Sequence, residues 1–325
     1  MSRALITGAA GFIGSHLSER LLADGYEVTA LDSFSDHYER ELKEFNLAAA
    51  LEDPRLKLIE GDLNDGLLGE LFDGQDVVFH LAARPGVRAS WEAFHDYSEA
   101  NITGSREVFH AAAEAGVPVV YASSSSIYGE TPSLPACETQ EPQPISPYGA
   151  SKVMTEVLAG AYAASFGLEA VGLRYFTVYG PRQRPDMGLS RFIEAMVDER
   201  PLPLYGDGLQ RRDMTYVGDI VEGTVLAAER GRRGSVYNLA SGSPFALLDI
   251  LEQLSEVVGC PLDLEREGAK PGDVRDTWGD ISRAAAELGY GPSMSLKAGL
   301  ERQVEEAERR RPLAMTASAQ PAPAA

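Results

Sequence analysis

Short apolar runs that alternate with stretches of helical periodicity are the feature that most constrains how this chain can fold. The runs cover residues 4–7, 27–32, 56–60, 76–83, 117–124 and 169–176. They are nearly continuous in apolar residues, as expected of strands that are covered on both faces. Helical patterns lie between them, notably over residues 12–24, 93–115 and 148–166. This alternation predicts an α/β fold with a doubly wound parallel sheet.

The second half of the chain predicts a smaller C-terminal lobe. After about Gly180 the sequence is rich in proline and glycine, and its helical patterns are shorter. These patterns cover residues 190–200, 219–230, 246–258, 281–288 and 296–309. We expect a Rossmann domain over residues 1–178 with a sheet return near 235–240, and a lobe formed mainly by residues 179–310. Residues 311–325 are Ala/Pro-rich without periodicity, which predicts a disordered tail.

Composition argues against several partners. The net charge is −20 and the pI is about 4.7, whereas nucleic acids and anionic membranes both require basic patches. No apolar stretch reaches the roughly 18 residues of a membrane span. The strand pattern that starts at Arg3 leaves no room for a signal peptide. Cys137 and Cys260 are far apart and form neither a CxxC nor a His-spaced pattern, which predicts no metal site and a reducing, cytoplasmic setting.

A glycine-rich turn connects the first predicted strand to the first predicted helix. Gly8, Gly11 and Gly14 permit a tight turn, and the helix N-terminus offers amides to a pyrophosphate. The second strand ends at Asp32, where a carboxylate can accept ribose hydroxyls and would repel a 2′-phosphate. The next residue, Ser33, is not a compensating arginine. The pattern predicts NAD rather than NADP; the alternative is a turn that only packs helix on strand.

Further candidates follow the third and fourth strands. Asp62 emerges at the end of the third strand, where it could bond an adenine amino group with Leu63 behind the ring. The small side chains of Ala82 and Ala83 permit close approach by a cofactor. His80 lies inside the apolar fourth strand, which favours a packed, hydrogen-bonded histidine over a catalytic one.

Tyr148 and Lys152 are four residues apart in SPYGASK, so they share one face of a predicted helix. A nearby ammonium lowers the pKa of a phenol because it favours the phenolate, and the tyrosine could then act as a general base. A serine at the end of the fifth strand, in YASSSSIYG, could bond the same substrate oxygen. This spacing is common by chance, and the glycine turn and the serine-rich strand end favour the catalytic interpretation.

Taken together, these segments resemble the NAD-dependent sugar-nucleotide epimerase/dehydratase family of extended short-chain dehydrogenases/reductases, from about Ala4 to Arg309. The segments that carry the resemblance are GAAGFIG, GDL, HLAA, SSSSIYG, YGASK, LRYFTVYGP, RRDMTYVGDI and PGDVRDT. The resemblance implies that Tyr148 is the base, that Lys152 lowers its pKa and holds the nicotinamide ribose, and that Ser124 binds the sugar oxygen. The implied NAD-binding residues are Gly8, Gly11, Phe12, Ile13, Gly14, Asp32, Asp62, Leu63, Leu81, Ala82, Ala83, Tyr148, Lys152 and Tyr175.

The serine-rich stretch also sorts the reactions of that family. Family dehydratases place Asp-Glu after the Ser/Thr and related decarboxylases have a Glu nearby, whereas Ser125 and Ser126 stand here. Without an acid to expel water, the resemblance implies oxidation and re-reduction at C4 of a UDP-sugar. The family often dimerises through helices at about 93–115 and 148–166, so a homodimer is expected.

The segment GPRQRPDM, residues 180–187, places two arginines in a stiff loop of an acidic chain. They either meet an anionic ligand or pair with some of the 49 acidic residues. The segment resembles that of UDP-glucuronate 4-epimerases, and RPGVRAS (84–90) resembles their sugar loop. A uronate carboxylate suits arginine, so the resemblance implies Arg184, with Arg88 as the second candidate.

The resemblance also implies residues for the nucleotide. Arg212 and Arg275 are candidates for the diphosphate and Asp273 for a uridine ribose hydroxyl; Lys270 is the alternative to Arg275, and surface ion pairs are the other interpretation. The implied substrate-binding residues are Arg88, Ser125, Ser126, Thr177, Arg184, Arg212, Asp273 and Arg275. A 4-epimerase of UDP-glucuronate is expected. The alternatives are a 4-epimerase of UDP-glucose or a UDP-N-acetylhexosamine, or a non-catalytic NAD-binding regulator.

Overall fold

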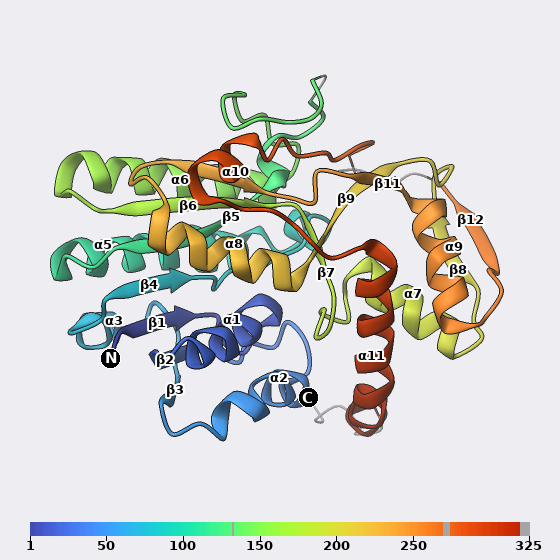
Figure 1. The fold of residues 1–325 in the computed structure, drawn as a ribbon, viewed down its shortest axis with the longest axis horizontal. Helices are drawn as coiled ribbons and strands as arrows, with labels where there is room; N and C mark the ends of the chain where they lie inside the picture. Colours follow the sequence, from blue (N-terminus) through green and yellow to red (C-terminus); the bar gives the residue numbers. More distant parts are fainter. Residues whose placement is uncertain (132, 269–273, 319–325) are drawn as a thin grey trace.

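A seven-stranded parallel sheet forms the centre of the larger half of the molecule (Figure 1). The computed structural model describes residues 1–131, 133–268 and 274–318. The strands are β1 (Arg3–Thr7), β2 (Glu27–Asp32), β3 (Leu56–Glu60), β4 (Val77–His80), β5 (Val119–Ser124), β6 (Ala170–Tyr175) and β10 (Val236–Leu239). Their order, β10-β6-β5-β4-β1-β2-β3, confirms the doubly wound sheet. The chain winds in opposite directions from β1, and such a reversal places a ligand crevice at the carboxyl edge between β1 and β4.

Helices cover both faces of this sheet, as its apolar strands require. One layer contains α1 (Phe12–Ala23), α2 (Arg40–Leu51), α8 (Val217–Arg230) and α10 (Ser282–Leu288). The other contains α3 (Leu68–Phe72), α5 (Gly104–Ala115) and α6 (Pro147–Phe166). Two apolar cores result: Leu17 and Val225 belong to the first, and Phe109 and Ala159 to the second. Burying each large side chain of this kind stabilises the fold by about 1.5–3 kcal/mol.

The long helix predicted over residues 93–115 is interrupted. It consists of α4 (Phe94–Tyr97), a π-helical turn (Ser98–Thr103) and α5. Asn101, in the π turn, is buried; its side chain accepts a hydrogen bond from Arg84 N at 2.7 Å and donates to Ser151 Oγ at 3.0 Å. Turns of this type occur mostly inside α-helices and often at functional sites. Here the turn fixes the loop after β4 against α6.

The smaller lobe, on the right of Figure 1, contains two small sheets and three helices among the described residues, and we call it the C-terminal half. The sheets are formed by β7 (Thr177–Tyr179), β9 (Arg211–Tyr216) and β11 (Pro244–Ala246), and by β8 (Leu202–Tyr205) and β12 (Leu264–Glu267). The helices are α7 (Gly188–Val197), α9 (Leu247–Val258) and α11 (Leu296–Ser318). More of the later sequence joins the seven-stranded sheet than predicted, because helices α8 and α10 pack on this sheet together with β10. Helix α11 also continues past Arg309 into the segment predicted as a tail.

Two short 3₁₀ turns matter for the site. Segments Ala89–Trp91 and Ser125–Ile127 each form one 3₁₀ turn, after β4 and β5 respectively. In the described part of the chain, no helix is both long and apolar enough to cross a membrane.

Candidate active site

The glycine-rich turn between β1 and α1 has the geometry of a dinucleotide-binding loop. Gly8 has a φ of 73°, and a Cβ on Gly14 would lie 2.1 Å from the Gly8 carbonyl oxygen, so both positions require glycine. Gly11 caps α1 without any side-chain hydrogen bond, so the first amides of the helix have no side-chain acceptor. Phe12 and Ile13 form that first turn. These residues fit the pyrophosphate of NAD.

Asp32 is held at the end of β2, next to this turn. Its carboxylate accepts hydrogen bonds from Ala10 N and from Phe34 N, both at 2.9 Å, and the residue is 9% exposed. Burial raises the pKa of Asp32, whereas the bond from Phe34 and the charge of Lys43 act in the opposite direction. The carboxylate is therefore fixed where the sequence predicts contact with a ribose.

The other predicted cofactor residues lie along the same edge of the sheet. Leu81, Ala82 and Ala83 follow β4 directly, and a Cβ on Gly8 would come within 2.7 Å of Ala82 N. Asp62, after β3, is exposed and accepts hydrogen bonds from Asn64, while Leu63 is buried. His80 confirms the expectation of a packed histidine.

His80 is bonded on both ring nitrogens inside β4. Its Nδ1 lies 2.8 Å from Thr7 Oγ1 and its Nε2 lies 3.0 Å from Ser105 Oγ. Burial lowers the pKa of His80 to about 3, so the ring is neutral. A neutral imidazole with a hydrogen-bond partner at each ring nitrogen joins β1, β4 and α5. His80 is not among the described residues that line the pocket beside Ser125 and Ser126.

Helix α6 is positioned by its first turn against the serine-rich end of β5. Ser146 caps the helix and accepts a hydrogen bond from Gly149 N at 3.1 Å. A Cβ on Gly149 would lie 2.6 Å from the Ser126 carbonyl oxygen, so glycine allows this close approach. Tyr148 and Lys152 consequently lie on one face of α6, beside the end of β5.

Ser124 lies close enough to Tyr148 to lower the pKa of its hydroxyl, while Ser124 Oγ itself lies 3.1 Å from Ser126 Oγ. Burial raises the pKa of Tyr148, and Ser124 and the charge of Arg184 lower it. Lys152, which the sequence analysis expected to lower this pKa, donates to the Ala122 carbonyl at 2.9 Å. Burial lowers the pKa of Lys152 to about 8, and the charge of Glu156 opposes that shift.

A buried ion pair beneath these residues was not predicted from the sequence. Arg174 on β6 donates to both carboxylate oxygens of Glu156 on α6, at 3.0 and 2.8 Å. Ser123 Oγ, next to Ser124, donates to the same carboxylate at 2.6 Å. The two side chains are only 4% and 12% exposed. A charged residue inside an apolar strand pattern, Arg174 in GLRYF, was the available signal.

A pocket opens beside Ser125 and Ser126, between β5 and the C-terminal half. Its lining includes four of the predicted substrate residues, namely Ser125, Ser126, Thr177 and Arg212. Thr277 and Trp278, which the sequence did not predict, also line it, as does Phe176. Arg212 donates to the carbonyls of Arg211 and Arg275 at 2.9 and 3.0 Å. A mixture of hydroxyls, aromatic rings and one guanidinium suits a nucleotide sugar.

Other predicted substrate residues have different surroundings. Arg88 is exposed, with its guanidinium 4.6 Å from the centre of the Tyr205 ring. Arg275 makes a two-bond ion pair with Asp207 at 2.9 and 3.0 Å. Tyr175, which was predicted to bind the cofactor, is buried, and its hydroxyl lies 2.8 Å from Thr224 Oγ1. Asp273 and Lys270 lie outside the described residues.

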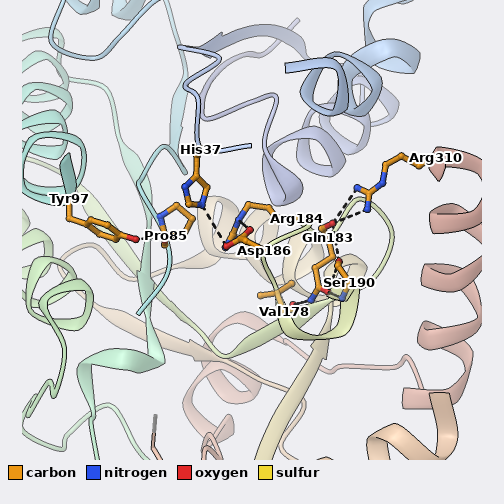
Figure 2. A network of polar contacts seen from close by, with 9 residues as sticks. All are labelled: His37, Pro85, Tyr97, Val178, Gln183, Arg184, Asp186, Ser190 and Arg310. Carbon is orange, nitrogen blue, oxygen red and sulfur yellow. Dashed lines mark hydrogen bonds and ion pairs between the residues drawn. The ribbon is translucent and has the colours of Figure 1, made fainter. Parts of the chain in front are cut away.

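Both arginines of the loop 180–187 are paired with carboxylates, which is one of the two alternatives left open by the sequence. Arg182 donates to Glu19 on α1 at 2.5 Å. Arg184 donates to Asp186 through Nε at 2.9 Å and Nη2 at 3.0 Å, and Asp186 Oδ2 lies 3.6 Å from His37 Nε2 (Figure 2). An anion-binding role for Arg184 therefore has to be compatible with Asp186.

Gln183 fixes the backbone of this loop from inside (Figure 2). It is 2% exposed, donates to the Val178 carbonyl at 2.9 Å and accepts from Ser190 N at 3.1 Å. Gln303 and Arg310 on α11 donate to its side-chain and main-chain oxygens, respectively. The loop is thereby attached to α7 and α11.

These features define an NAD-binding enzyme of the extended short-chain dehydrogenase/reductase class, with a Ser–Tyr–Lys set at the carboxyl edge of a doubly wound sheet. The sequence model of the NAD dependent epimerase/dehydratase family matches residues 4–240. The chain belongs to that family.

Two relatives and one solved structure are similar over nearly the full length. The uncharacterized UDP-glucose epimerase YtcB of Bacillus subtilis (strain 168) is 40% identical over 306 residues, covering 93% of this chain and 96% of YtcB. A UDP-glucuronate 4-epimerase of Thermodesulfobacterium geofontis (strain OPF15) is 38% identical, covering 94% and 95%. The crystal structure of UDP-glucuronic acid 4-epimerase from Bacillus cereus in complex with UDP-glucuronic acid and NAD has a TM-score of 0.91 and 39% identity, covering 94% and 99%.

Replacing Asp32 tests its role in cofactor choice. Asp32→Asn should narrow the preference for NAD over NADP, because the carboxylate accepts ribose hydroxyls and repels a 2′-phosphate. Binding of both dinucleotides to wild type and variant measures the effect. Asp53→Asn, at a partly exposed carboxylate paired with Arg55, is the control and should change neither affinity. A wild-type protein that binds NADP more tightly would contradict this assignment.

Proposed function

We propose that this protein is an NAD-dependent UDP-glucuronate 4-epimerase that interconverts UDP-glucuronate and UDP-galacturonate. The observation that carries the proposal is the packing of the first turn of α6 against the end of β5, which places Tyr148 beside Ser124, with Ser125 and Ser126 in the adjacent pocket. The relatives and the solved structure named above support the choice of reaction and of cofactor.

The lining of the pocket supports epimerisation over loss of water. Among its described residues the only carboxylate is that of Asp276. Burial raises the pKa of Asp276, but the hydrogen bonds from Arg211 outweigh it and hold the pKa below its usual range. Asp276 thus remains ionised and cannot protonate a leaving hydroxyl, which leaves oxidation and re-reduction at C4.

Tyr148 would move the proton of the reaction. As phenolate it accepts the proton of the C4 hydroxyl while Ser124 holds the same oxygen, and it returns that proton when the ketone is reduced from the other face. NAD, when bound, accepts the hydride from C4 and gives it back. Ser124 and the Arg184 charge favour the phenolate against the effect of burial.

Lys152 and Arg212 would hold the two ends of the reacting assembly. Lys152 is buried on the same face of α6 as Tyr148, where its ammonium can meet a nicotinamide ribose. Its pKa of about 8 leaves most of it protonated at neutral pH. Arg212, in the pocket, is the diphosphate candidate. Anchoring the diphosphate lets the 4-keto sugar rotate in the site without dissociating from the enzyme.

Arg184 is proposed to bind the C6 carboxylate of the substrate. Oxidation at C4 creates a β-keto acid, which loses CO₂ when the C5–carboxylate bond stands perpendicular to the carbonyl plane. A charge-assisted contact would hold that bond away from this alignment and would select the uronate. Arg184 is 16% exposed and close enough to Tyr148 for its charge to act on that group.

One observation favours a second candidate, a UDP-glucose or UDP-N-acetylhexosamine 4-epimerase. The guanidinium of Arg184 is already engaged by Asp186, and Arg184 is not among the described residues that line the pocket. In that case Arg184 would stabilise the conformation of the loop and would not bind a substrate carboxylate. The two candidates share the chemistry at C4 and differ only at C6.

Product analysis tests the reaction. Incubated separately with UDP-glucuronate and UDP-glucose, the protein should convert the uronate to its C4 epimer, as resolved by NMR.

Tyr148→Phe should keep NAD bound and lower turnover by about 10²–10⁴, because the base is lost. Tyr205→Phe, a partly buried tyrosine on β8, is the matched control. Turnover above about a tenth of wild type in Tyr148→Phe would exclude Tyr148 as the base.

Arg184→Ala tests substrate selection. The transition-state stabilisation of UDP-glucuronate, calculated from kcat/KM, should fall by about 1.5–3 kcal/mol, the range for hydrogen bonds to charged groups. Any turnover of neutral UDP-glucose should change far less. A UDP-pentose by-product is expected as well, because the carboxylate is no longer held. The kcat/KM values on both substrates and the NMR spectrum of the products measure these effects. Equal losses of kcat/KM on the two sugars would show that Arg184 does not recognise the carboxylate.

A homodimer through α5 and α6 is part of the proposal. Met154 and Val157, three residues apart on α6, are 43% and 58% exposed, which leaves adjacent apolar side chains on one side of α6 for a second copy of the chain. Val157→Glu should halve the mass measured by light scattering, whereas Leu209→Glu, at an equally exposed site in the other half, should not. A monomeric wild type would contradict the proposal.

A reducing, cytoplasmic setting is proposed because Cys137 and Cys260 are both free thiols.

A further inference from the structure

Arg184 presents only part of its guanidinium. Asp186 occupies the side edge formed by Nε and Nη2, at 2.9 and 3.0 Å. Within the described part of the chain, Nη1 makes no hydrogen bond to protein. A guanidinium has five N–H donors and can serve two carboxylates at once, one on the side edge and one on the end edge. The contact with Asp186 therefore leaves the end edge, Nη1 and Nη2, for a second anion.

We propose that Asp186 is a positioning residue that holds the end edge of Arg184 toward the carboxylate of the sugar substrate, and that His37 holds Asp186 in turn. This inference rests on the proposed function, because it requires a uronate. It adds two residues that do not touch the substrate, and one of them comes from the cofactor half of the molecule.

The geometry shows why a positioning residue is needed. The backbone of the loop is fixed by Gln183, by Pro185 and by the hydrogen bond that Arg182 N donates to Glu306 Oε2 at 3.0 Å. The long side chain of Arg184 would still rotate freely on this fixed backbone. Its contact with Asp186 removes that freedom before the substrate arrives, so less entropy is lost on binding.

His37 connects this arrangement to the cofactor site. It lies between β2 and α2, five residues after Asp32, and Figure 2 shows its ring facing Asp186. Its Nε2 is buried and has no hydrogen bond within the usual distance. Burial would raise the pKa of Asp186, but the contacts with His37 and Arg184 hold it well below its usual range, so the carboxylate stays charged.

The opposite role for Asp186 makes the inference testable. If Asp186 merely competed with the substrate for Arg184, its removal would tighten binding of UDP-glucuronate. If it positions Arg184, its removal weakens binding of the uronate and leaves UDP-glucose unaffected. The sign of the change therefore separates the two roles.

The experiment is a titration of UDP-glucuronate and of UDP-glucose into NAD-loaded wild type, Arg184→Ala, Asp186→Asn and the double variant. Asp186→Asn should weaken UDP-glucuronate binding about three- to tenfold, and UDP-glucose binding less than about twofold. In the Arg184→Ala background, Asp186→Asn should cost less than about twofold more, because a residue that acts through Arg184 has no further effect once Arg184 is gone. His37→Gln should give a smaller loss of the same selectivity, and Asp186→Glu should restore part of it.

Asp198→Asn is the matched control. Asp198 pairs with Arg200 at the same two-residue spacing, at the end of α7, and its removal should leave both affinities unchanged. Tighter binding of UDP-glucuronate by Asp186→Asn, or additive losses in the double variant, would overturn the inference alone. Equal affinity of the wild type for the two sugars would overturn the proposed substrate and the inference with it. Should Asp186→Asn fail to fold, the His37→Gln variant decides by the same criterion.

Discussion

The buried pair between Arg174 and Glu156 is the interaction on which the rest of the site depends. It joins β6 to α6, and through Ser123 it reaches the strand end that carries Ser124. Burying two charges costs free energy that their attraction only partly returns, so such a pair contributes more to position than to stability. It fixes the distance between α6 and β5 while keeping a carboxylate one helical turn from Lys152.

The electrostatics of the site are local and run against the charge of the whole chain. A molecule with a net charge of −20 repels an anionic nucleotide sugar at long range. Arg212 and Arg184 are the proposed anion-binding residues, and Asp276 and Asp207 are held by other cations, Arg211 and Arg275, whereas Asp186 pairs with Arg184 itself. Selectivity for an anion is thus a property of a few fixed guanidinium groups at short range.

The sequence predicted best what depends on near neighbours along the chain. Apolar periodicity located the strands, and short motifs located the glycine turn, Asp32 and the Tyr148–Lys152 face, because each is read within a few residues. It could not predict that Arg182 would meet Glu19, 163 residues away, since any of many carboxylates could pair with it. The π turn at Asn101 was missed because it adds no break to the helical pattern. Asp186, only two residues from Arg184, carried a signal that was readable but ambiguous.

The attachment of α11 to the loop 180–187 has a consequence for how this enzyme could be altered. Gln303, Glu306 and Arg310 hold the loop from a helix more than a hundred residues further along the chain. The composition of the C-terminus suggests a dispensable tail, yet cutting the chain just before Arg310 would release one of these contacts. Exchanging the loop between relatives to transfer specificity would also require exchanging the matching face of α11. Loop and helix form one structural unit, although they are far apart in the sequence.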